Sequence, residues 1–215
     1  MKAVYDLVLF DLDGTLTESG PGITSSLKAT LNKMQIALPQ DLHKFIGPPL
    51  FDSFKKYCKM TDEQAKAGIA IYRDFYNETG VFNNSVYPGL MELLRQLREA
   101  GAKISVATSK PQPQADVVLN HFQIAPLLDF VSGAAEDERS STKAGLIEQA
   151  VAACKAEKSR TVMIGDTRFD AEGAKKAGVD FIGVLYGYGT REEMENEGAA
   201  CFANTVEELG EILIR

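Results

Sequence analysis

The chain has 215 residues, with 30 acidic and 23 basic side chains and a formal net charge of -7. This length accommodates one large domain, or one domain that carries an insertion. Affinity for nucleic-acid polymers comes largely from Lys and Arg that neutralise phosphates, so the acidic balance argues against a nucleic-acid partner. The apolar runs are shorter than the roughly 18 residues of a membrane helix, and the N-terminus lacks the pattern of a signal peptide. We therefore expect a protein with no membrane partner.

The three cysteines also indicate the compartment. Cys58, Cys154 and Cys201 are far apart and show neither metal-ligand nor redox spacing. We predict free thiols, as is typical of a reducing, cytoplasmic environment.

The chain begins with a predicted strand over residues 4–10 (VYDLVLF), whose nearly continuous apolar character is typical of a central parallel strand covered on both faces. A polar turn, Asp11-Leu12-Asp13-Gly14-Thr15, follows it. Residues 18–82 then show apolar side chains at helical spacing and no convincing strand. Helices are predicted over residues 22–35, over residues 49–59, and from a capping box at Thr61 to a stop at Thr79-Gly80.

From Tyr87 onward the pattern alternates between strands and helices. Predicted strands cover residues 103–108, 128–131, 161–165 and 181–185. Predicted helices cover residues 89–101, 112–122, 142–155, 168–177 and 206–213. Such alternation is typical of βαβ units and a parallel sheet. We therefore predict an α/β fold with a sheet core of residues 1–17 and 83–215, flanked by helices, and a small all-helical insertion, residues 18–82, after the first strand.

Polar side chains gather where three of these strands end. Asp11 and Asp13 follow the first strand, Thr108-Ser109-Lys110 the second, and Gly165-Asp166-Thr167 the fourth. Ligands of open α/β sheets bind at the carboxyl ends of the strands. Carboxylates gathered there repel one another unless a hard cation such as Mg²⁺ joins them, and hydroxyl groups with a lysine suit phosphate oxygens.

These residues resemble the motifs of the haloacid dehalogenase-like (HAD) superfamily. Asp11–Thr15 is similar to its first motif, Thr108 or Ser109 to the second, Lys143 at a helix start to the third, and Gly165–Asp170 to the fourth. Residues 17–23 and 46–49 resemble the phosphoglycolate phosphatase and nucleotidase branch with a helical cap. Only residues 133–139, before Lys143, follow the pattern of the relatives loosely. The resemblance implies a Rossmann-like core.

The resemblance also implies roles for the acidic residues. Asp11 would be the nucleophile that forms an aspartyl-phosphate, and Asp13 the general acid and base, with a pKa above that of Asp11. Mg²⁺ would be held by the Asp11 carboxylate, the main-chain carbonyl of Asp13 and Asp166. Asp170 would orient water or Lys143, although direct ligation of the metal is an alternative.

Phosphate binding is assigned in the same way. Lys143 would neutralise the transferring phosphoryl oxygens. Gly14 is also expected to bind the phosphate. Thr108 or Ser109 would donate hydrogen bonds, and the motif position directly after the strand favours Thr108.

The function implied is a Mg²⁺-dependent phosphatase that hydrolyses a small phosphorylated metabolite, with phosphoglycolate as the first substrate and a nucleoside monophosphate as the second. A phosphosugar mutase would use the same aspartate pair. A receiver-like binding module is the non-enzymatic alternative, which the second aspartate and the helical insertion argue against. A monomer or a homodimer is expected.

Residues 18–82 would form a lid that excludes water, with hinges near residues 17–20 and 83–87. The Gly47-Pro48-Pro49 loop would touch the substrate, and Lys44, Phe45 and Arg73 are candidates for reading the leaving group. His43 and His121 belong to no motif and are predicted to be non-catalytic. Tyr186 and Tyr188 are predicted to lie in a surface loop, with contact to the substrate or the lid as the alternative.

Overall fold

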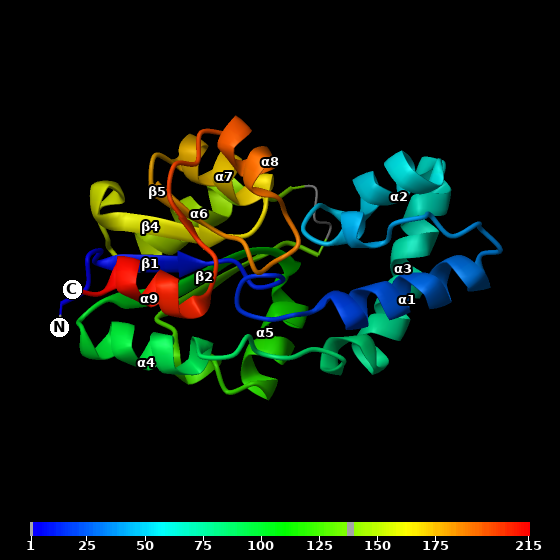
Figure 1. Ribbon diagram of the computed structural model, residues 1–215. Helices are drawn as coiled ribbons and strands as arrows, with labels where there is room; N and C mark the ends of the chain where they lie inside the picture. Colours follow the sequence, from blue (N-terminus) through cyan, green and yellow to red (C-terminus); the bar gives the residue numbers. More distant parts are fainter. Residues whose placement is uncertain (1, 137–139) are drawn as a thin grey trace.

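The computed structural model describes residues 2–136 and 140–215. Its centre is a six-stranded parallel sheet with the strand order β3-β2-β1-β4-β5-β6. The strands are β1 (Leu7–Phe10), β2 (Lys103–Pro111), β3 (Phe130–Ala134), β4 (Thr161–Gly165), β5 (Asp180–Val184) and β6 (Phe202–Ala203). The predicted α/β fold is confirmed (Figure 1).

Helices cover both faces of the sheet because alternate residues of each strand point to opposite sides. Leu7 and Leu9 of β1 pack in one core, against α6 (Lys143–Ala153) and α7 (Arg168–Ala177). Val8 and Phe10 pack in the other. The helices of that second layer are α4 (Leu90–Glu99), α5 (Gln112–His121) and α9 (Val206–Leu213). All four residues of β1 are fully buried, which explains the continuous apolar run.

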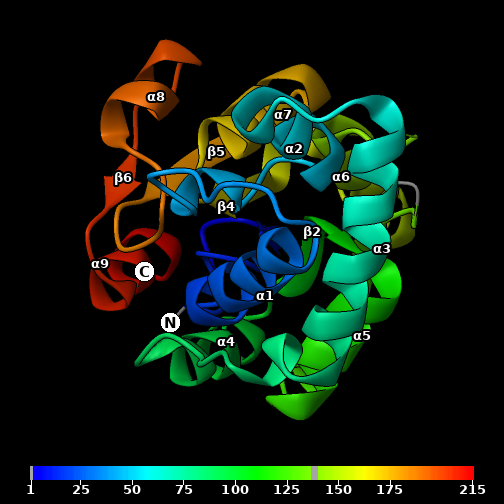
Figure 2. The same cartoon turned by 90° about the vertical axis from the view of Figure 1, so that its right-hand side faces the viewer.

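Between β1 and α4 the described regular elements are helices. They are α1 (Gly20–Lys33), the short 3-10 helix η1 (His43–Phe45), α2 (Leu50–Cys58), α3 (Asp62–Glu78) and the 3-10 helix η2 (Gly80–Phe82). The capping box predicted at Thr61 is confirmed, with Gln64 as its partner. These helices lie beyond the end of the sheet that is opposite the two chain termini (Figure 1), and Figure 2 shows α1, α2 and α3 in front of the strands.

The two connections to this helical segment run side by side. Thr17 and Val86 form an antiparallel bridge, and the Glu18 N–H donates to the Ser85 carbonyl over 2.8 Å. The predicted hinges at residues 17–20 and 83–87 therefore form a two-stranded connection.

Several boundaries differ from the sequence prediction. β1 begins at Leu7, not at residue 4, and the Val4 N–H donates to the Leu213 carbonyl of α9, away from the neighbouring strands. β3 lies two residues later than predicted. α8 (Arg191–Asn196) and β6 were not predicted, since both are too short for periodicity to reveal and β6 is defined by its pairing with β5.

The cysteines are free, as predicted. Cys154 is buried, while Cys58 and Cys201 are partly exposed. No helix among the described residues has the length and apolar character to cross a membrane.

Candidate active site

The site forms where the strand order reverses, between β1 and β4. In parallel sheets of this kind the crevice outside the carboxyl ends of these strands binds ligands. Phe10 of β1 pairs with Ile164 of β4, and the Asp11 N–H extends the pairing by donating to the Ile164 carbonyl over 2.9 Å. The register thus places Asp11 next to Gly165, one residue before Asp166, and both aspartates are buried.

A third carboxylate completes a buried cluster with these two. Oxygen atoms of Asp11, Asp166 and Asp170 all lie within 4.8 Å of one another. Asp170 lies in the first turn of α7, where the N–H and the hydroxyl of Thr167 donate to its Oδ2 at 3.1 and 2.8 Å.

Lys143 joins the cluster from the first position of α6. Its Nζ lies 2.9 Å from Asp11 Oδ1 and 2.8 Å from Asp170 Oδ1, and it also donates to the Ala107 carbonyl. Burial by itself would lower the pKa of Lys143, but the Asp11 and Asp170 carboxylates outweigh burial and hold the pKa above its ordinary value. Gly173 leaves room for the lysine, since a Cβ there would lie 2.5 Å from Lys143 Cγ.

The carboxylates are under electrostatic strain. Burial raises the pKa of Asp11 to about 6 against the opposing effect of Lys143. Burial, followed by the neighbouring Asp170 and Asp11, raises the pKa of Asp166 well above its ordinary value. Hydrogen bonds from the Tyr188 N–H and the Thr15 hydroxyl oppose that rise.

Asp13 lies outside this cluster and pairs with a second lysine. Lys110 Nζ, at the end of β2, lies 2.8 and 3.0 Å from the two Asp13 oxygens. The same Nζ lies 4.7 Å from the centre of the Tyr76 ring on α3. The sequence indicated Lys110 as a lysine at the rim that suits phosphate oxygens, whereas in the structure it pairs with Asp13. The Tyr76 contact was missed because the approach of α3 to β2 is a tertiary feature.

Negative charge exceeds positive charge around Asp11 and Asp13. Asp11, Asp13, Asp166 and Asp170 face two ammonium groups, those of Lys110 and Lys143. If all are ionised, two negative charges remain, and the donors are oxygen atoms. Such a donor set fits a hard divalent cation such as Mg²⁺.

The other predicted phosphate-binding residues lie at the same edge of the sheet. Thr108 is buried and accepts a hydrogen bond from the Lys110 N–H over 3.2 Å, while Ser109 is partly exposed. Both residues line the cavity beside Asp11, so the choice between them stays open. Gly14 has a φ of +87°, and a Cβ there would lie 2.2 Å from Asp166 Oδ2, so the turn requires glycine.

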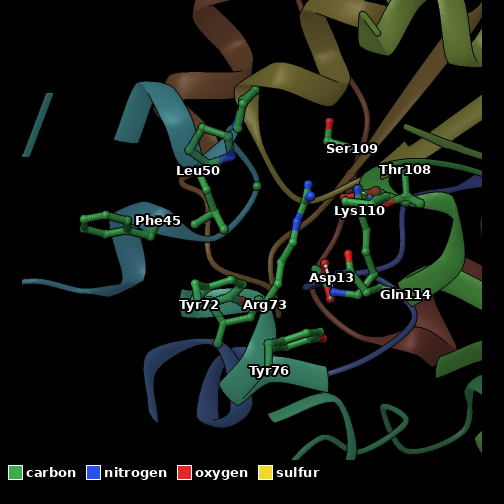
Figure 3. A pocket seen from close by; sticks show the side chains of 16 residues that line it. Asp13, Phe45, Leu50, Tyr72, Arg73, Tyr76, Thr108, Ser109, Lys110 and Gln114 are labelled. Carbon is green, nitrogen blue, oxygen red and sulfur yellow. Dashed lines mark hydrogen bonds and ion pairs between the residues drawn. The ribbon is translucent and has the colours of Figure 1, made fainter. Parts of the chain in front are cut away.

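A small cavity of about 60 Å³ separates these residues from the helical segment. On its far side lie Phe45, Leu50, Tyr72, Arg73 and Tyr76 (Figure 3). Residues 47–49, which are predicted to touch the substrate, line it as well. Arg73 also donates to the Glu136 carbonyl, which links α3 to the loop after β3. Lys44 lines a different hollow, together with His43 and Tyr188.

The prediction of a surface loop at Tyr186 and Tyr188 was wrong. The Tyr188 N–H donates to Asp166 Oδ2 over 2.8 Å, and the Tyr188 hydroxyl accepts from the Gly20 N–H over 2.6 Å. The Tyr186 hydroxyl donates to the Thr15 carbonyl. Between them, a Cβ on Gly187 would lie 2.4 Å from Asp166. The sequence does carry a sign of this packing, because a glycine stands between two tyrosines directly after a buried strand.

Neither histidine lines the cavity. His43 lies 6.0 Å from the Tyr188 ring, and His121 lies beside Phe82. In the loosely matching stretch before Lys143, residues 137–139 lie outside the described part of the chain.

Comparison with known proteins finds relatives that match over most of this chain. A 5'-nucleotidase of Pseudomonas aeruginosa is 35% identical over 88% of this chain and 87% of that protein. A tyrosine-protein kinase PtkA of Mycobacterium tuberculosis is 36% identical over 96% of this chain and 72% of that protein. A phosphoglycolate phosphatase of Caulobacter vibrioides is 31% identical over 93% of this chain and 88% of that protein.

A solved structure and a family profile agree with them. The crystal structure of a predicted phosphatase from Clostridium acetobutylicum is 42% identical, with a TM-score of 0.92 and 98% of both chains covered. The profile of the haloacid dehalogenase-like hydrolases matches residues 8–184. The chain therefore belongs to the haloacid dehalogenase-like hydrolase family, among its phosphatases.

Proposed function

We propose that the chain hydrolyses a small phosphomonoester in two steps through an aspartyl-phosphate on Asp11. The observation that carries this proposal is the position of Asp11. Its carboxylate is buried, contacts Lys143 at 2.9 Å and lines the same small cavity as Asp13 and Thr108. A nucleophile, a cation for the phosphoryl oxygens and a second carboxyl group thus surround one small space.

In the first step, an Asp11 oxygen attacks phosphorus and the bond from phosphorus to the leaving oxygen breaks. Asp13 donates a proton to that oxygen, and Lys143 and Thr108 stabilise the phosphoryl oxygens. In the second step, a water oxygen attacks phosphorus while Asp13 takes its proton. The bond to Asp11 then breaks, which restores the carboxylate and releases phosphate.

Asp11, Asp166 and the Asp13 carbonyl would hold a Mg²⁺ ion. When bound, the ion neutralises charge so that an anionic carboxylate can approach an anionic phosphate. The surplus of negative charge described above supports this assignment. Asp170, through its contact with Lys143, would orient that lysine.

Residues 18–82 would act as a cap that closes over the site, with residues 1–17 and 83–215 as the core. The cavity between them, at about 60 Å³, is small beside the pockets of about 300 to 1,000 Å³ that hold drug-sized ligands. This size favours a small leaving group, as in phosphoglycolate, over the nucleoside of a nucleotide, and it favours water over a bulky acceptor such as a protein tyrosine. Such a substrate and the net charge of -7 are consistent with a cytoplasmic enzyme.

The test is a screen of the purified protein against phosphorylated metabolites, with 2-phosphoglycolate, nucleoside monophosphates and sugar phosphates included. Specificity constants are measured with Mg²⁺ and again after chelation. We expect Mg²⁺-dependent release of phosphate and the highest constant for a small phosphorylated acid. Asp11→Asn should abolish release, while the exposed Asp6→Asn serves as a matched control.

The alternatives predict different results. A mutase would need a sugar bisphosphate and return the phosphoryl group to the sugar, and a nucleotidase would prefer nucleotides. A receiver-like module would turn over none of the substrates. Full activity of Asp11→Asn would refute the assignment of Asp11 as the nucleophile.

A further inference from the structure

Lys110 is a buried lysine that the reaction described above does not use. Its side chain is only 5% exposed, and its Nζ lies within 3.0 Å of both oxygens of Asp13. Contact with both oxygens restrains the carboxylate more than contact with one. Burial by itself would lower the pKa of Lys110, but the Asp13 carboxylate outweighs burial and keeps the lysine charged.

Tyr76 holds the other side of this ammonium group. The Tyr76 ring, on the cap helix α3, lies 4.7 Å from Lys110 Nζ, a distance at which a cation is attracted to the face of an aromatic ring. Tyr76 in turn stacks on Tyr72 with ring centres 5.4 Å apart. Asp13, Lys110 and Tyr76 therefore form a continuous connection from the sheet to the cap (Figure 3).

We propose that Lys110, supported by Tyr76, is a positioning residue that holds Asp13 for hydrolysis of the phosphoenzyme. This inference depends on the proposed two-step function. Two contacts from Lys110 fix the position of the Asp13 carboxyl group, and this group must face the attacking water to take its proton. The proton passes from water to Asp13, the water oxygen bonds to phosphorus, and the bond between phosphorus and Asp11 breaks.

The connection to α3 makes this step dependent on the position of the cap. When α3 withdraws, Lys110 loses the Tyr76 ring and becomes accessible to water, so Asp13 is restrained less. Hydrolysis of the phosphoenzyme is then fastest under a closed cap, where bulk water and other acceptors are excluded.

The test separates the two steps with acetyl phosphate, a small substrate whose acetate leaving group departs without a proton. In Lys110→Met, the initial burst of acetate should be retained, while the steady-state rate falls about 10- to 100-fold. This loss is smaller than the roughly 100- to 10,000-fold that general-base catalysis contributes, because Asp13 itself is still present. Phosphoenzyme should accumulate, measured as acid-stable protein-bound phosphate from labelled substrate. Lys103→Met, at the opposite end of β2, is the matched control and should leave both phases unchanged.

The cap side is tested by two substitutions at one position. Tyr76→Leu, which removes the ring, should slow the steady state several-fold with the burst retained, and Tyr76→Phe, which keeps the ring face, should restore most of that loss. These two variants carry the test if Lys110→Met does not fold.

An equal loss of burst and steady state in Lys110→Met, or equal rates for the two Tyr76 variants, would overturn the inference. Wild-type turnover in Asp11→Asn, or no release of phosphate by the wild-type protein from any substrate of the screen, would instead refute the proposed function itself.

Discussion

Replacing Asp11, the proposed nucleophile, should make the metal-free protein more stable, because its carboxylate is buried among like charges. Its pKa is raised from 3.8 to about 6 in the folded state. Between pH 4 and 6 the folded protein therefore retains a proton that the unfolded chain has released, so the free energy of unfolding falls as the pH rises through this window. Above pH 6 the free energy of unfolding has fallen by its full amount. For a pKa shift of this size, that amount is at most about 3 kcal/mol.

The Asp11→Asn variant escapes this cost because an amide carries no charge. Without metal at pH 7, we expect its free energy of unfolding to exceed that of the wild type by up to about 3 kcal/mol. At about 2 to 4 °C per kcal/mol for a chain of this size, the melting temperature should rise by several degrees. Near pH 4 the two proteins should converge, since the wild-type carboxyl group is then protonated.

The assay is thermal unfolding followed by circular dichroism between pH 4 and pH 8, in EDTA and in excess Mg²⁺. Mg²⁺ should stabilise the wild type more than the variant, because the ion compensates the buried charge and binds only the folded state. Asp6→Asn, at an exposed carboxylate paired with Arg160, controls for the loss of one negative charge. Identical pH profiles of wild type and Asp11→Asn in EDTA would show that the buried charge of Asp11 does not limit stability.

Three further substitutions test the site. Asp13→Asn should form phosphoenzyme slowly and then retain it, measured with labelled substrate, and a normal steady-state rate would contradict its role as acid and base. Asp166→Ala should raise the Mg²⁺ concentration needed for half-maximal activity at least tenfold, and an unchanged metal titration would exclude Asp166 as a ligand. Gly187→Ala should lower both activity and melting temperature, because the added Cβ would lie 2.4 Å from Asp166. Wild-type behaviour of that variant would show that the loop after β5 moves without cost.

Much of this protein was predictable because its signals are local. The apolar run that ends at Asp11 predicts a central strand, and the helical spacing after it predicts the inserted helices. Side chains at the ends of parallel strands meet at one edge of the sheet, so order along the chain was enough to expect Asp11 and Asp166 together. Lys143, at a helix start, was expected beside them from the resemblance to the family. The structure places them within one cluster of contacts.

The remaining features depend on which elements touch across the fold. Three contacts illustrate this: the Asp13–Lys110 pair, the Tyr76 ring beside Lys110, and the contact of Tyr188 with Asp166. Each joins positions that are between 22 and 97 residues apart in the chain. No local periodicity encodes such pairings, because they arise only when α3 and the loop after β5 pack over the ends of the strands. Sequence determined which groups carry the chemistry, whereas tertiary packing decided their partners, since burial and neighbouring charge are properties of the assembled fold.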